Sequence, residues 1–562
     1  MRKLLFVFIL FTFYLSPSVV RKLLFVFILF TFYLSPSQSP TWQWAQSGTC
    51  TTTDNGSAVT SDNSGNVFTT GYFFGSNFTF STTTLINAGN YDAYVAKHDN
   101  LGNFLWARAI GGAFDDVANA IVCDNSGNVF VTGYFTSSTL AIGAFTLTNL
   151  GGTDVFIAKF DANGNVLWAK SFGDNMIEES NGIACDGSNI YVTGQFQSNS
   201  INFGTGTLTC NGGGDVFTAK YDNNGNELWA KGFGDVGLEI GYGITTTTAN
   251  EIYVTGSFKS PVLTFSTYTL NNMGGSDYFI IRYDNSGNEI WAKGAGGNFD
   301  DAGTSIKQGF AGEIFTTGYF KSTTISFGFI TYSNASIASA DIFLVNYDNL
   351  GNESWSAAYG GPLDDISYGI VCDPSGNVFI GGHIHSSSIA FGTYTLTCSG
   401  VGDGFLAKLN PSGIVVWAEN QGGLNDDGIN GIAGDPASNV LITGFYNSSL
   451  ISFNPYSLNN NGSSDLCLAK LANPPSSVKE ATNNNSTSLL FPNPTSAGFT
   501  ISNLLQNTAV KIFDMNGKEV MTPQLVSSEN TFIDVRHLLD GIYFVNIISD
   551  NSRQTLKLSV LH

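Results

Sequence analysis

Charged side chains are scarce in this chain of 562 residues, since Asp, Glu, Lys and Arg together make up only 12% of it. The charges that are present are mostly acidic, 44 against 23, and the formal net charge is −21. Such a chain would repel a phosphate backbone, so nucleic acid is excluded as an expected partner. No Lys/Arg run occurs outside the N-terminus, which also argues against binding to an anionic membrane surface.

Long apolar runs are lacking as well. At the N-terminus, Arg2 and Lys3 precede an apolar run over residues 4–15 that is too short to cross a bilayer and is typical of a secretory signal peptide. Residues 2–18 recur identically at 21–37, through a local duplication or a misassigned start site. We therefore expect residues 1–38 to be a duplicated signal peptide region cleaved near Ser37. The mature protein is expected to have no transmembrane segment.

The sequence gives no sign of a disulfide framework, because the seven cysteines are odd in number and no CxxC motif occurs. Cys123, Cys185 and Cys372 occupy one position of the repeat described below, where other copies carry Ser61 or Gly434. That equivalence predicts a small buried core position, and we expect neither disulfides nor metal binding from these cysteines. The chain also lacks G-x-S-x-G, H-E-x-x-H, phosphate-loop and dinucleotide-binding motifs, so no familiar catalytic motif marks an enzyme.

Internal repetition dominates what is present. A tryptophan recurs every 61 to 64 residues, at Trp44, Trp106, Trp168, Trp229, Trp291, Trp355 and Trp417. A glycine recurs in step at Gly71, Gly133, Gly194, Gly256, Gly318, Gly382 and Gly444. An aspartate recurs in step at Asp92, Asp154, Asp215, Asp277, Asp341, Asp403 and Asp465. Seven copies of one unit therefore span residues 42–472.

Each copy predicts four short strands. In the second copy they cover residues 118–124, 128–135, 154–161 and 166–171, which are rich in β-branched and aromatic residues. Turns such as Asp-Asn-Ser-Gly-Asn at 124–128 join them, because Gly permits a positive φ and Asp bonds its own backbone. These turns lack the spacing and terminal Glu of an EF-hand, so we do not interpret them as calcium loops.

The two ends of the repeat region complement each other. The chain enters at residues 41–45 with a lone fourth strand and leaves at residues 465–470 with a third strand that lacks a fourth. The N-terminal strand would thus close the ring, which predicts an all-β protein whose residues 39–472 form a seven-bladed β-propeller with four strands per blade. The repeats resemble the bacterial β-propeller family called SBBP in their D-x-x-G-N-V-F-V-T-G and D-x-F-x-A-K-x-D segments. That resemblance implies the fold and no particular function.

A second unit follows the propeller. Residues 473–488 are rich in Pro, Ser and Asn and predict a flexible linker, and residues 489–562 alternate apolar and polar positions as a small Ig-like β-sandwich does. Residues 489–562 also resemble the type A sorting domain of the Bacteroidetes type IX secretion system. The residues that carry this resemblance are Pro492, Asn493, Pro494, Gly517, Gly541, Tyr543 and Lys557.

The resemblance implies passage through the periplasm, export by the type IX secretion machinery, and removal of the tail. The product would be extracellular or held on the outer cell surface. The alternative, an Ig-like domain with a binding role of its own, stays open.

Two acidic positions recur on one expected face of the propeller. One is the third-strand aspartate; the other follows each tryptophan by ten residues, at Asp54, Asp116, Glu178, Glu239, Asp301, Asp365 and Asp427. A ring of these carboxylates at the channel mouth would suit a hard cation such as Ca²⁺, and no other cofactor is expected. The interpretation that we favour is that each acid accepts backbone N–H groups of its own or the neighbouring blade, since a binding site usually breaks repeat symmetry. Paired acids could also serve a glycosidase or lyase, but the near-equivalent pairs are too many for one active site.

Histidines break the repeat. His383 and His385 stand at the end of one second strand, where other copies carry aromatic residues, and their spacing of two puts them on one strand face. With Asp365 or Asp403 they could bind a metal, although we favour a partly exposed strand end. His98 replaces an aromatic residue and is expected to serve packing.

The long links between second and third strands predict an extra hairpin in each blade, and their exposed tips are a candidate ligand surface. These links cover residues 74–91, 136–153, 197–214, 259–276, 321–340, 385–402 and 447–464. The sequence favours a secreted or cell-surface, non-catalytic binding or adhesion protein that presents one propeller face to a glycan or protein ligand. The alternatives are an extracellular polysaccharide hydrolase or lyase that uses the acidic loops, and a structural surface-coat component.

Overall fold

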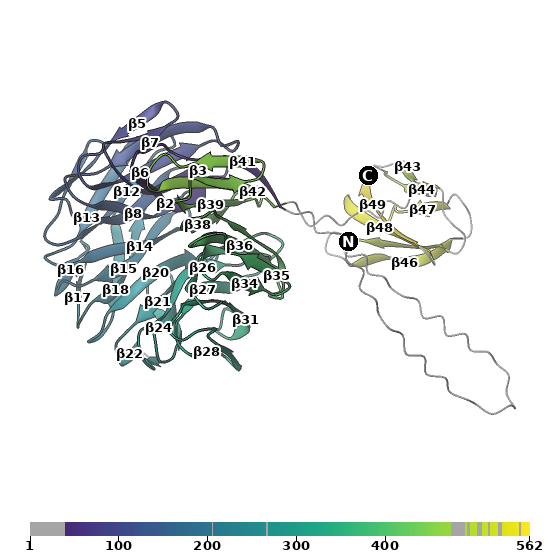
Figure 1. Cartoon of the computed structure of the whole chain (residues 1–562). Coiled ribbons are helices and arrows are strands. Elements are labelled where there is room, and N and C mark those ends of the chain that lie inside the picture. Colours follow the sequence, from purple (N-terminus) through teal and green to yellow (C-terminus); the bar gives the residue numbers. More distant parts are fainter. Residues whose placement is uncertain are drawn as a thin grey trace. The chain divides into compact units, whose positions relative to one another are not determined.

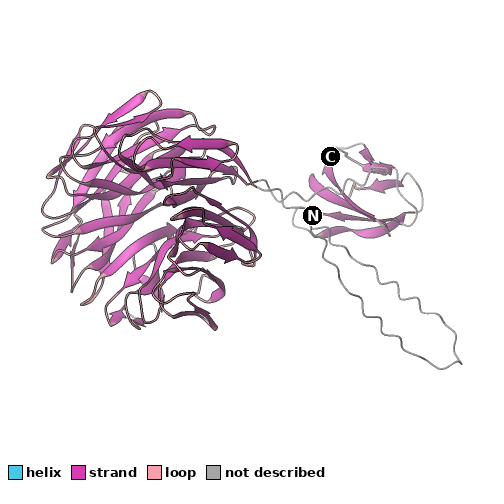
Figure 2. Cartoon of the chain, viewed as in Figure 1, coloured by secondary structure: helices cyan, strands magenta, loops and turns pink. Residues whose placement is uncertain are grey.

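The computed structural model describes residues 40–204, 206–265, 268–473, 489–491, 495–502, 508–514, 518–526, 531–549 and 552–562. Within these ranges the chain forms strands and no helix, as Figure 2 shows. The all-β fold class predicted from the sequence is therefore confirmed. No helix in the described ranges could cross a bilayer. The expected signal peptide region and most of the expected linker lie outside the described residues.

Seven antiparallel four-stranded sheets make up the repeat region (Figure 1). In spatial order the first four are β2 (Thr53–Ser61), β3 (Val67–Phe74), β6 (Tyr91–His98), β7 (Phe104–Ile110); β8 (Asp116–Cys123), β9 (Val129–Phe135), β12 (Asp154–Phe160), β13 (Val166–Phe172); β14 (Glu178–Cys185), β15 (Asn189–Phe196), β18 (Asp215–Asp222), β19 (Glu227–Phe233); and β20 (Glu239–Thr246), β21 (Ile252–Phe258), β24 (Asp277–Tyr283), β25 (Glu289–Ala295). The remaining three are β26 (Asp301–Gln308), β27 (Ile314–Phe320), β30 (Asp341–Tyr347), β31 (Glu353–Tyr359); β32 (Asp365–Cys372), β33 (Val378–Ile384), β36 (Asp403–Leu409), β37 (Val415–Gln421); and β38 (Asp427–Gly434), β39 (Val440–Tyr446), β42 (Asp465–Ala472), β1 (Thr41–Gln46).

The first strands of the sheets form the inner ring. Each contacts the first strand of the next sheet, and β38 of the last sheet contacts β2 of the first, so the ring is closed. Strand β1 completes the last sheet by pairing with β42, as its sequence predicts. The tryptophan strands are the outermost, at the opposite edge of each sheet. This arrangement is a β-propeller built from seven four-stranded sheets.

The repeated glycine of each second strand is required by a bulge in the first strand. In the second sheet the register of β8 against β9 shifts between Ala118 and Ala120. The bulge brings the carbonyl oxygen of Val117 so close to Gly133 that a Cβ there would overlap it. The other six repeats place a first-strand carbonyl against the equivalent glycine in the same way. A bulge that recurs in every repeat therefore accounts for the recurring glycine.

Six of the seven repeated tryptophans bond to a turn of the next blade within the described residues. The indole N–H of Trp106 donates to the carbonyl oxygen of Ala162, 3.1 Å away in the next blade, and its ring covers the turn residue Gly164. Trp44 of β1 does the same to Asn100 of the first sheet, at 3.2 Å. The N-terminal strand thus holds the ring closed from both sides, through β42 and through the turn at Asn100.

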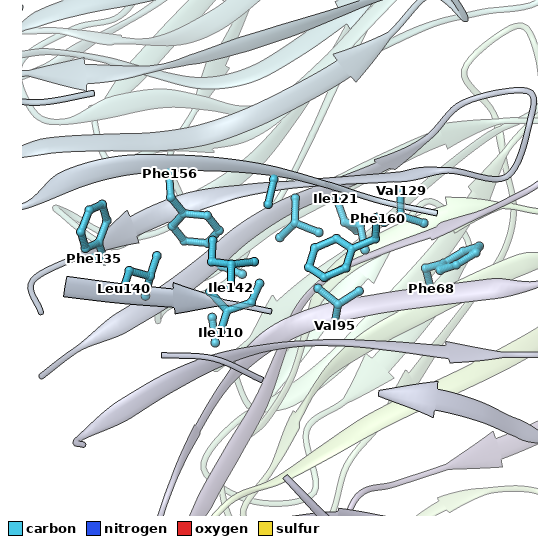
Figure 3. Packing of buried hydrophobic residues seen from close by; sticks show 14 of the residues in the cluster. Phe68, Val95, Ile110, Ile121, Val129, Phe135, Leu140, Ile142, Phe156 and Phe160 are labelled. Atoms are coloured by element: carbon cyan, nitrogen blue, oxygen red, sulfur yellow. The ribbon is translucent and has the colours of Figure 1, made fainter. Parts of the chain in front are cut away.

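The expected hairpins are present and cover the outer strands. They are β4 (Asn77–Phe80) with β5 (Thr83–Ile86), β10 (Thr139–Ile142) with β11 (Phe145–Thr148), β16 (Ser200–Asn202) with β17 (Thr207–Thr209), β22 (Val262–Thr264) with β23 (Thr269–Asn271), β28 (Thr324–Phe327) with β29 (Ile330–Ser333), β34 (Ser388–Phe391) with β35 (Tyr394–Thr397), and β40 (Leu450–Phe453) with β41 (Tyr456–Asn459). Figure 3 shows Leu140 and Ile142 of β10 buried beside Ile110 and Phe156. The buried side of each hairpin therefore belongs to the core of its blade, and only the other side is free to meet a ligand.

The C-terminal residues form two further sheets. One contains β43 (Leu489–Phe491), β44 (Gly498–Ser502) and β47 (Thr531–Asp534); the other contains β46 (Glu519–Val526), β45 (Thr508–Phe513), β48 (Gly541–Ser549) and β49 (Ser552–Val560). Apolar side chains from both sheets share one buried core, among them Phe499, Ile512 and Val545. The described strands agree with a small β-sandwich, and its Ig-like classification stays a prediction.

Candidate functional site

The two recurring acids lie together where one blade meets the next. The links from fourth to first strands and the links that precede the third strands lie on one face of the propeller, which we call the link face. Parallel bridges such as Thr153 to Ile177 and Gly402 to Asp426 join the two kinds of link. Both acids stand at this face, at the beginning of their strands, as the sequence predicts.

The first-strand acids are fully buried and bound to their surroundings. Asp301 accepts the hydroxyl and backbone N–H of Ser322, at 2.6 and 3.1 Å, and Asp365 and Asp427 are held by Ser386 and Ser448 in the same way. The seven candidate cation ligands, Asp54, Asp116, Glu178, Glu239, Asp301, Asp365 and Asp427, are all 0% exposed. Asp54 departs from the pattern, since it accepts the N–H of Leu466 at 2.7 Å.

Six of the seven third-strand aspartates have a carboxyl oxygen without a hydrogen-bond donor among the described residues. Asp154 accepts the backbone N–H of Leu150 through Oδ2, at 3.1 Å, whereas Oδ1 has no hydrogen-bond partner among the described residues. The carboxyl group packs on Gly173, where a Cβ would overlap it. The same unpartnered oxygen occurs at Asp92, Asp277, Asp341, Asp403 and Asp465. A buried oxygen without a donor makes the ionised carboxylate costly.

Each third-strand aspartate faces the first-strand acid of the next blade. The Asp215 and Glu239 carboxylates, for example, both lie against the same point above Gly234. The seven carboxyl pairs are Asp92–Asp116, Asp154–Glu178, Asp215–Glu239, Asp277–Asp301, Asp341–Asp365, Asp403–Asp427 and Asp465–Asp54.

Burial raises the pKa of the seven third-strand aspartates and of Asp54, Asp116, Asp301 and Asp365, and in several pairs the facing carboxyl adds to the effect. Burial together with the charge of Asp92 raises the pKa of Asp116 to about 7. Burial and Glu178 raise the pKa of Asp154 to about 6. The pKa of Asp54 lies well above its usual range, because it is buried and Asp465 stands opposite. These pairs therefore favour holding a proton near neutral pH.

The structure distributes the candidate cation ligands over seven separate junctions. Their oxygens are engaged with backbone N–H and serine hydroxyl groups, as the favoured interpretation requires. Among the described residues no group of three or more His, Cys, Asp or Glu is arranged to hold a metal ion. A role in Ca²⁺ binding stays a prediction that the described geometry does not by itself support.

The histidine pair is placed differently from the metal set considered above. The His385 imidazole contacts Asp426, with 3.2 Å between Nε2 and Oδ1, and only the backbone N–H of His385 reaches Asp365. His383 lies 3.1 Å from the Asn430 side chain, and burial lowers its pKa to about 4. His385 is partly exposed, with 31% of its side chain accessible. The two imidazoles thus contact Asn430 and Asp426 of the neighbouring blade, and metal binding with Asp365 or Asp403 stays a hypothesis.

Around His383 the structure assembles a group that sequence reasoning missed. We call it the acidic–aromatic cluster: Asp300, Tyr319, Asp364, Tyr368, His383, Asp426 and Phe445. The His383 ring lies 4.8 Å from the Tyr368 ring and 5.3 Å from the Phe445 ring. Burial raises the pKa of the Tyr319 hydroxyl, and the nearby Asp300 and Tyr368 add to this effect. The sequence signal was the position after each repeated glycine, where Ser257, Tyr319, His383 and Phe445 differ from one another.

The link face is also rich in exposed apolar side chains. Ten of them stand in its links: Phe114, Leu150, Met176, Ile177, Val236, Met273, Ile337, Leu363, Val401 and Leu424. Several are more than half exposed, as Leu424 is at 81% and Ile337 at 77%. Exposed apolar side chains that gather on one face of a soluble protein are candidates for an interaction site.

The opposite face, which carries the tight turns, has a pocket of about 280 Å³. It is lined by Phe310, Val371, Pro374 and the turn residues Asp373 and Asp435. Asp373 and Asp435 are occupied by their own turns, where each accepts two backbone N–H groups. The other polar side chains that line the pocket are Lys307, Ser438 and Asn439.

The cysteines and His98 behave mainly as core residues. All seven cysteines are free. Cys123, Cys185 and Cys372 are half-buried and pack against the blade cores. The predicted burial was too high because each cysteine is the last residue of its first strand. His98 is 3% exposed, with its ring 5.7 Å from that of Phe104, which agrees with the packing role.

The sorting residues are described in part. Pro492, Asn493, Pro494 and Gly517 lie outside the described residues, and Lys557 lies in β49 opposite Phe544. Gly541 begins β48, and the buried Tyr543 folds back over it to donate its hydroxyl to the carbonyl oxygen of Leu539, at 2.9 Å. This contact gives a physical reason for the Gly-x-Tyr spacing.

Comparison with known proteins assigns the C-terminal unit to a domain family. Residues 489–561 match the family described as secretion system C-terminal sorting domain. An uncharacterized WD repeat-containing protein of Acanthamoeba polyphaga mimivirus is 24% identical over 65% of this chain and 32% of its own length. The chain thus spans about a third of this curated relative.

Solved structures are similar at a coarser level. PorZ, described as an essential surface component of the type IX secretion system of Porphyromonas gingivalis, has 11% identity and a TM-score of 0.23 over 90% of this chain and 81% of PorZ. Puromycin hydrolase has 9% identity and a TM-score of 0.33 over 70% of this chain and 58% of its own. Such scores carry no argument about function. The match to the sorting-domain family does support a conclusion about export. The C-terminal residues form a type IX secretion sorting domain, and the protein is exported to the cell surface or the extracellular space.

Proposed function

We propose that this protein is a non-catalytic binding or adhesion protein that presents the link face of its propeller to a glycan or protein ligand. It is made with an N-terminal signal peptide, crosses the periplasm, and uses a type A sorting domain that is removed on export. The SBBP-type repeat supplies the scaffold. The link face, with its apolar side chains and acidic–aromatic cluster, supplies the ligand surface.

One contrast on the link face carries this proposal. The recurring acids, which an acid–base enzyme would need, are 0 to 3% exposed and face one another in the junctions between blades. The apolar side chains of the same face are exposed, with nothing in the described residues to cover them. Buried, repeated acids suit a scaffold, and exposed apolar and aromatic groups suit a contact surface.

The test uses the secreted chain, a panel of bacterial and host polysaccharides and surface proteins, and buffers with and without a chelator. We expect retention on at least one ligand and no new product masses. A variant with Leu363→Ser and Leu424→Ser should lose retention, whereas Leu101→Ser and Leu350→Ser, on the turns of the opposite face, should keep it. New oligosaccharides would instead support a hydrolase or lyase, and self-association without any ligand a coat component.

A further inference from the structure

The acidic–aromatic cluster breaks the symmetry of the propeller on three consecutive blades. Strands β26, β32 and β38 begin after Asp300, Asp364 and Asp426. Among the other four blades the equivalent residue is an acid once, at Asp115, and is uncharged at Thr53, Ile177 and Leu238. Repeated features serve the fold, so a sector in which three consecutive blades carry this acid beside differing side chains at Tyr319, His383 and Phe445 points to a specific contact.

The carboxylates of this sector are available to a ligand, unlike the buried pairs. Asp300 and Asp364 are exposed, and their Oδ1 atoms accept the backbone N–H groups of Ser276 and Ala340, respectively. Asp426 has 36% of its side chain accessible and holds His385. His383 adds no positive charge at neutral pH, since burial keeps its pKa near 4.

The aromatic rings beside these carboxylates already attract a cation of the chain itself. The ammonium group of Lys321 lies 5.9 Å from the centre of the Tyr319 ring. The neighbouring Tyr368 is 37% exposed, and Phe445 is half-buried. A cation over an aromatic face gains about 0.5–1 kcal/mol at an exposed site, and nearby carboxylates add to that attraction.

Charge complementarity selects one kind of occupant. The described link face carries further carboxylates at Asp115, Asp174 and Asp235, against the two lysines Lys259 and Lys321, and the whole chain has a net charge of −21. Exposed apolar side chains such as Leu363 and Leu424 adjoin the cluster in the same links. Exposed apolar side chains beside a negative, aromatic cluster suit a protein surface that projects a lysine or arginine.

We propose that the acidic–aromatic cluster binds a lysine or arginine side chain of a partner protein. The proposal rests on the proposed function and narrows its ligand from a glycan or protein to a basic protein surface. Asp300 and Asp364 contact the cationic group, and Tyr319 and Tyr368 offer their ring faces to it. The exposed apolar side chains of the links pack against the surrounding surface of the partner protein.

The test uses the full secreted chain and a fluorescent peptide of three arginines, with its neutral citrulline analogue as the reference probe. We expect the arginine peptide to bind, the citrulline peptide to bind at least about tenfold more weakly, and affinity to fall with salt. The variant Asp300→Asn with Asp364→Asn keeps the oxygens that accept backbone N–H groups. It should weaken binding by about tenfold or more.

Two matched variants separate the site from bulk charge. Asp284→Asn with Asp348→Asn makes the same change of charge on the opposite face, where asparagine already forms the equivalent turn at Asn410. That variant should bind as the parent does. Tyr319→Leu with Tyr368→Leu leaves the net charge unchanged and should still weaken binding, by about fivefold.

Equal losses in the two Asp→Asn variants would overturn the proposal, since binding would then follow net charge alone. Retention of a glycan that is insensitive to all cluster variants would also overturn it while leaving the binding function intact. Product formation on the polysaccharide panel would count against the proposed function itself, so the two failures are distinguishable.

Discussion

At the scale of single residues, the repeated glycines report on neighbours that the sequence does not display. Gly133 has no unusual φ; it is required because the Val117 carbonyl oxygen of the bulged first strand occupies the place of a Cβ. The glycine recurrence was visible in the sequence, but the bulge was not, because a bulge changes pairing without changing composition.

Gly133→Ala should destabilise the propeller by about 1–3 kcal/mol, because the new methyl group must displace backbone of the first strand. Denaturant unfolding of the secreted chain measures the loss. Gly206→Ala is the control, since nothing lies within 4 Å of that position, and it should change stability by less than about 0.5 kcal/mol. Equal effects of the two substitutions would contradict the steric explanation.

His98→Phe should stabilise the chain, and more so in acid. His98 is buried with Nδ1 unpartnered, and burial lowers its pKa to about 4. A histidine whose folded pKa lies below its unfolded value of about 6.5 loses stability as pH falls from 6.5 to 4, because the unfolded chain takes up the proton first. Phe does not titrate, and Phe160 already fills this position in the next repeat. Thermal unfolding at pH 8 and pH 5 checks the prediction; an equal gain at both pH values would contradict it.

At the scale of elements, β1 is the strand that closes the ring. It pairs with β42 and, through Trp44, bonds the turn of the first sheet at Asn100. Without it the last sheet would expose β42 as an unpaired edge, which invites aggregation. Deletion of residues 41–46 should therefore lower the unfolding temperature and increase light scattering.

A peptide of residues 41–46 added in trans should restore the unfolding temperature by strand addition, and the same peptide with Trp44→Ser should restore less of it. No change on deletion would show that β1 is dispensable for closure.

Much of this architecture could be predicted from sequence because it is periodic. The second sheet begins at Asp116 and not at residue 118 as expected, since the acid itself pairs with Phe135. Its other three strands agree within one residue. The acid pairs were only half visible: both positions were found, but their meeting across a junction depends on how blades are rotated against each other. The acidic–aromatic cluster was not predicted, because its residues come from three repeats and meet only across the junctions between blades.

At the scale of the whole molecule, acids with a raised pKa accumulate around the ring. Burial raises the pKa of Asp92, Asp154, Asp215 and Asp277 to about 6, and that of Asp116, Asp301 and Asp341 to about 7. An unfolded aspartate titrates near 3.9. Between about pH 4 and pH 7 the folded chain therefore binds more protons than the unfolded chain, and stability rises as pH falls through this range.

The chain should accordingly unfold at a higher temperature at pH 5 than at pH 8, even though His98 and His383 oppose the trend with pKa values lowered to about 4. Asp154→Asn should raise stability at pH 8 and reduce the difference between the two pH values, because the amide needs no proton to face Glu178. Asp161→Asn, at the other end of the same strand, should leave the difference unchanged, since hydrogen bonds from Asn165 and Asn163 lower the pKa of Asp161. Stability that falls from pH 8 to pH 5 in the parent chain would show that the junctions do not hold protons, and would return attention to a cation as the group that the unpartnered oxygens await.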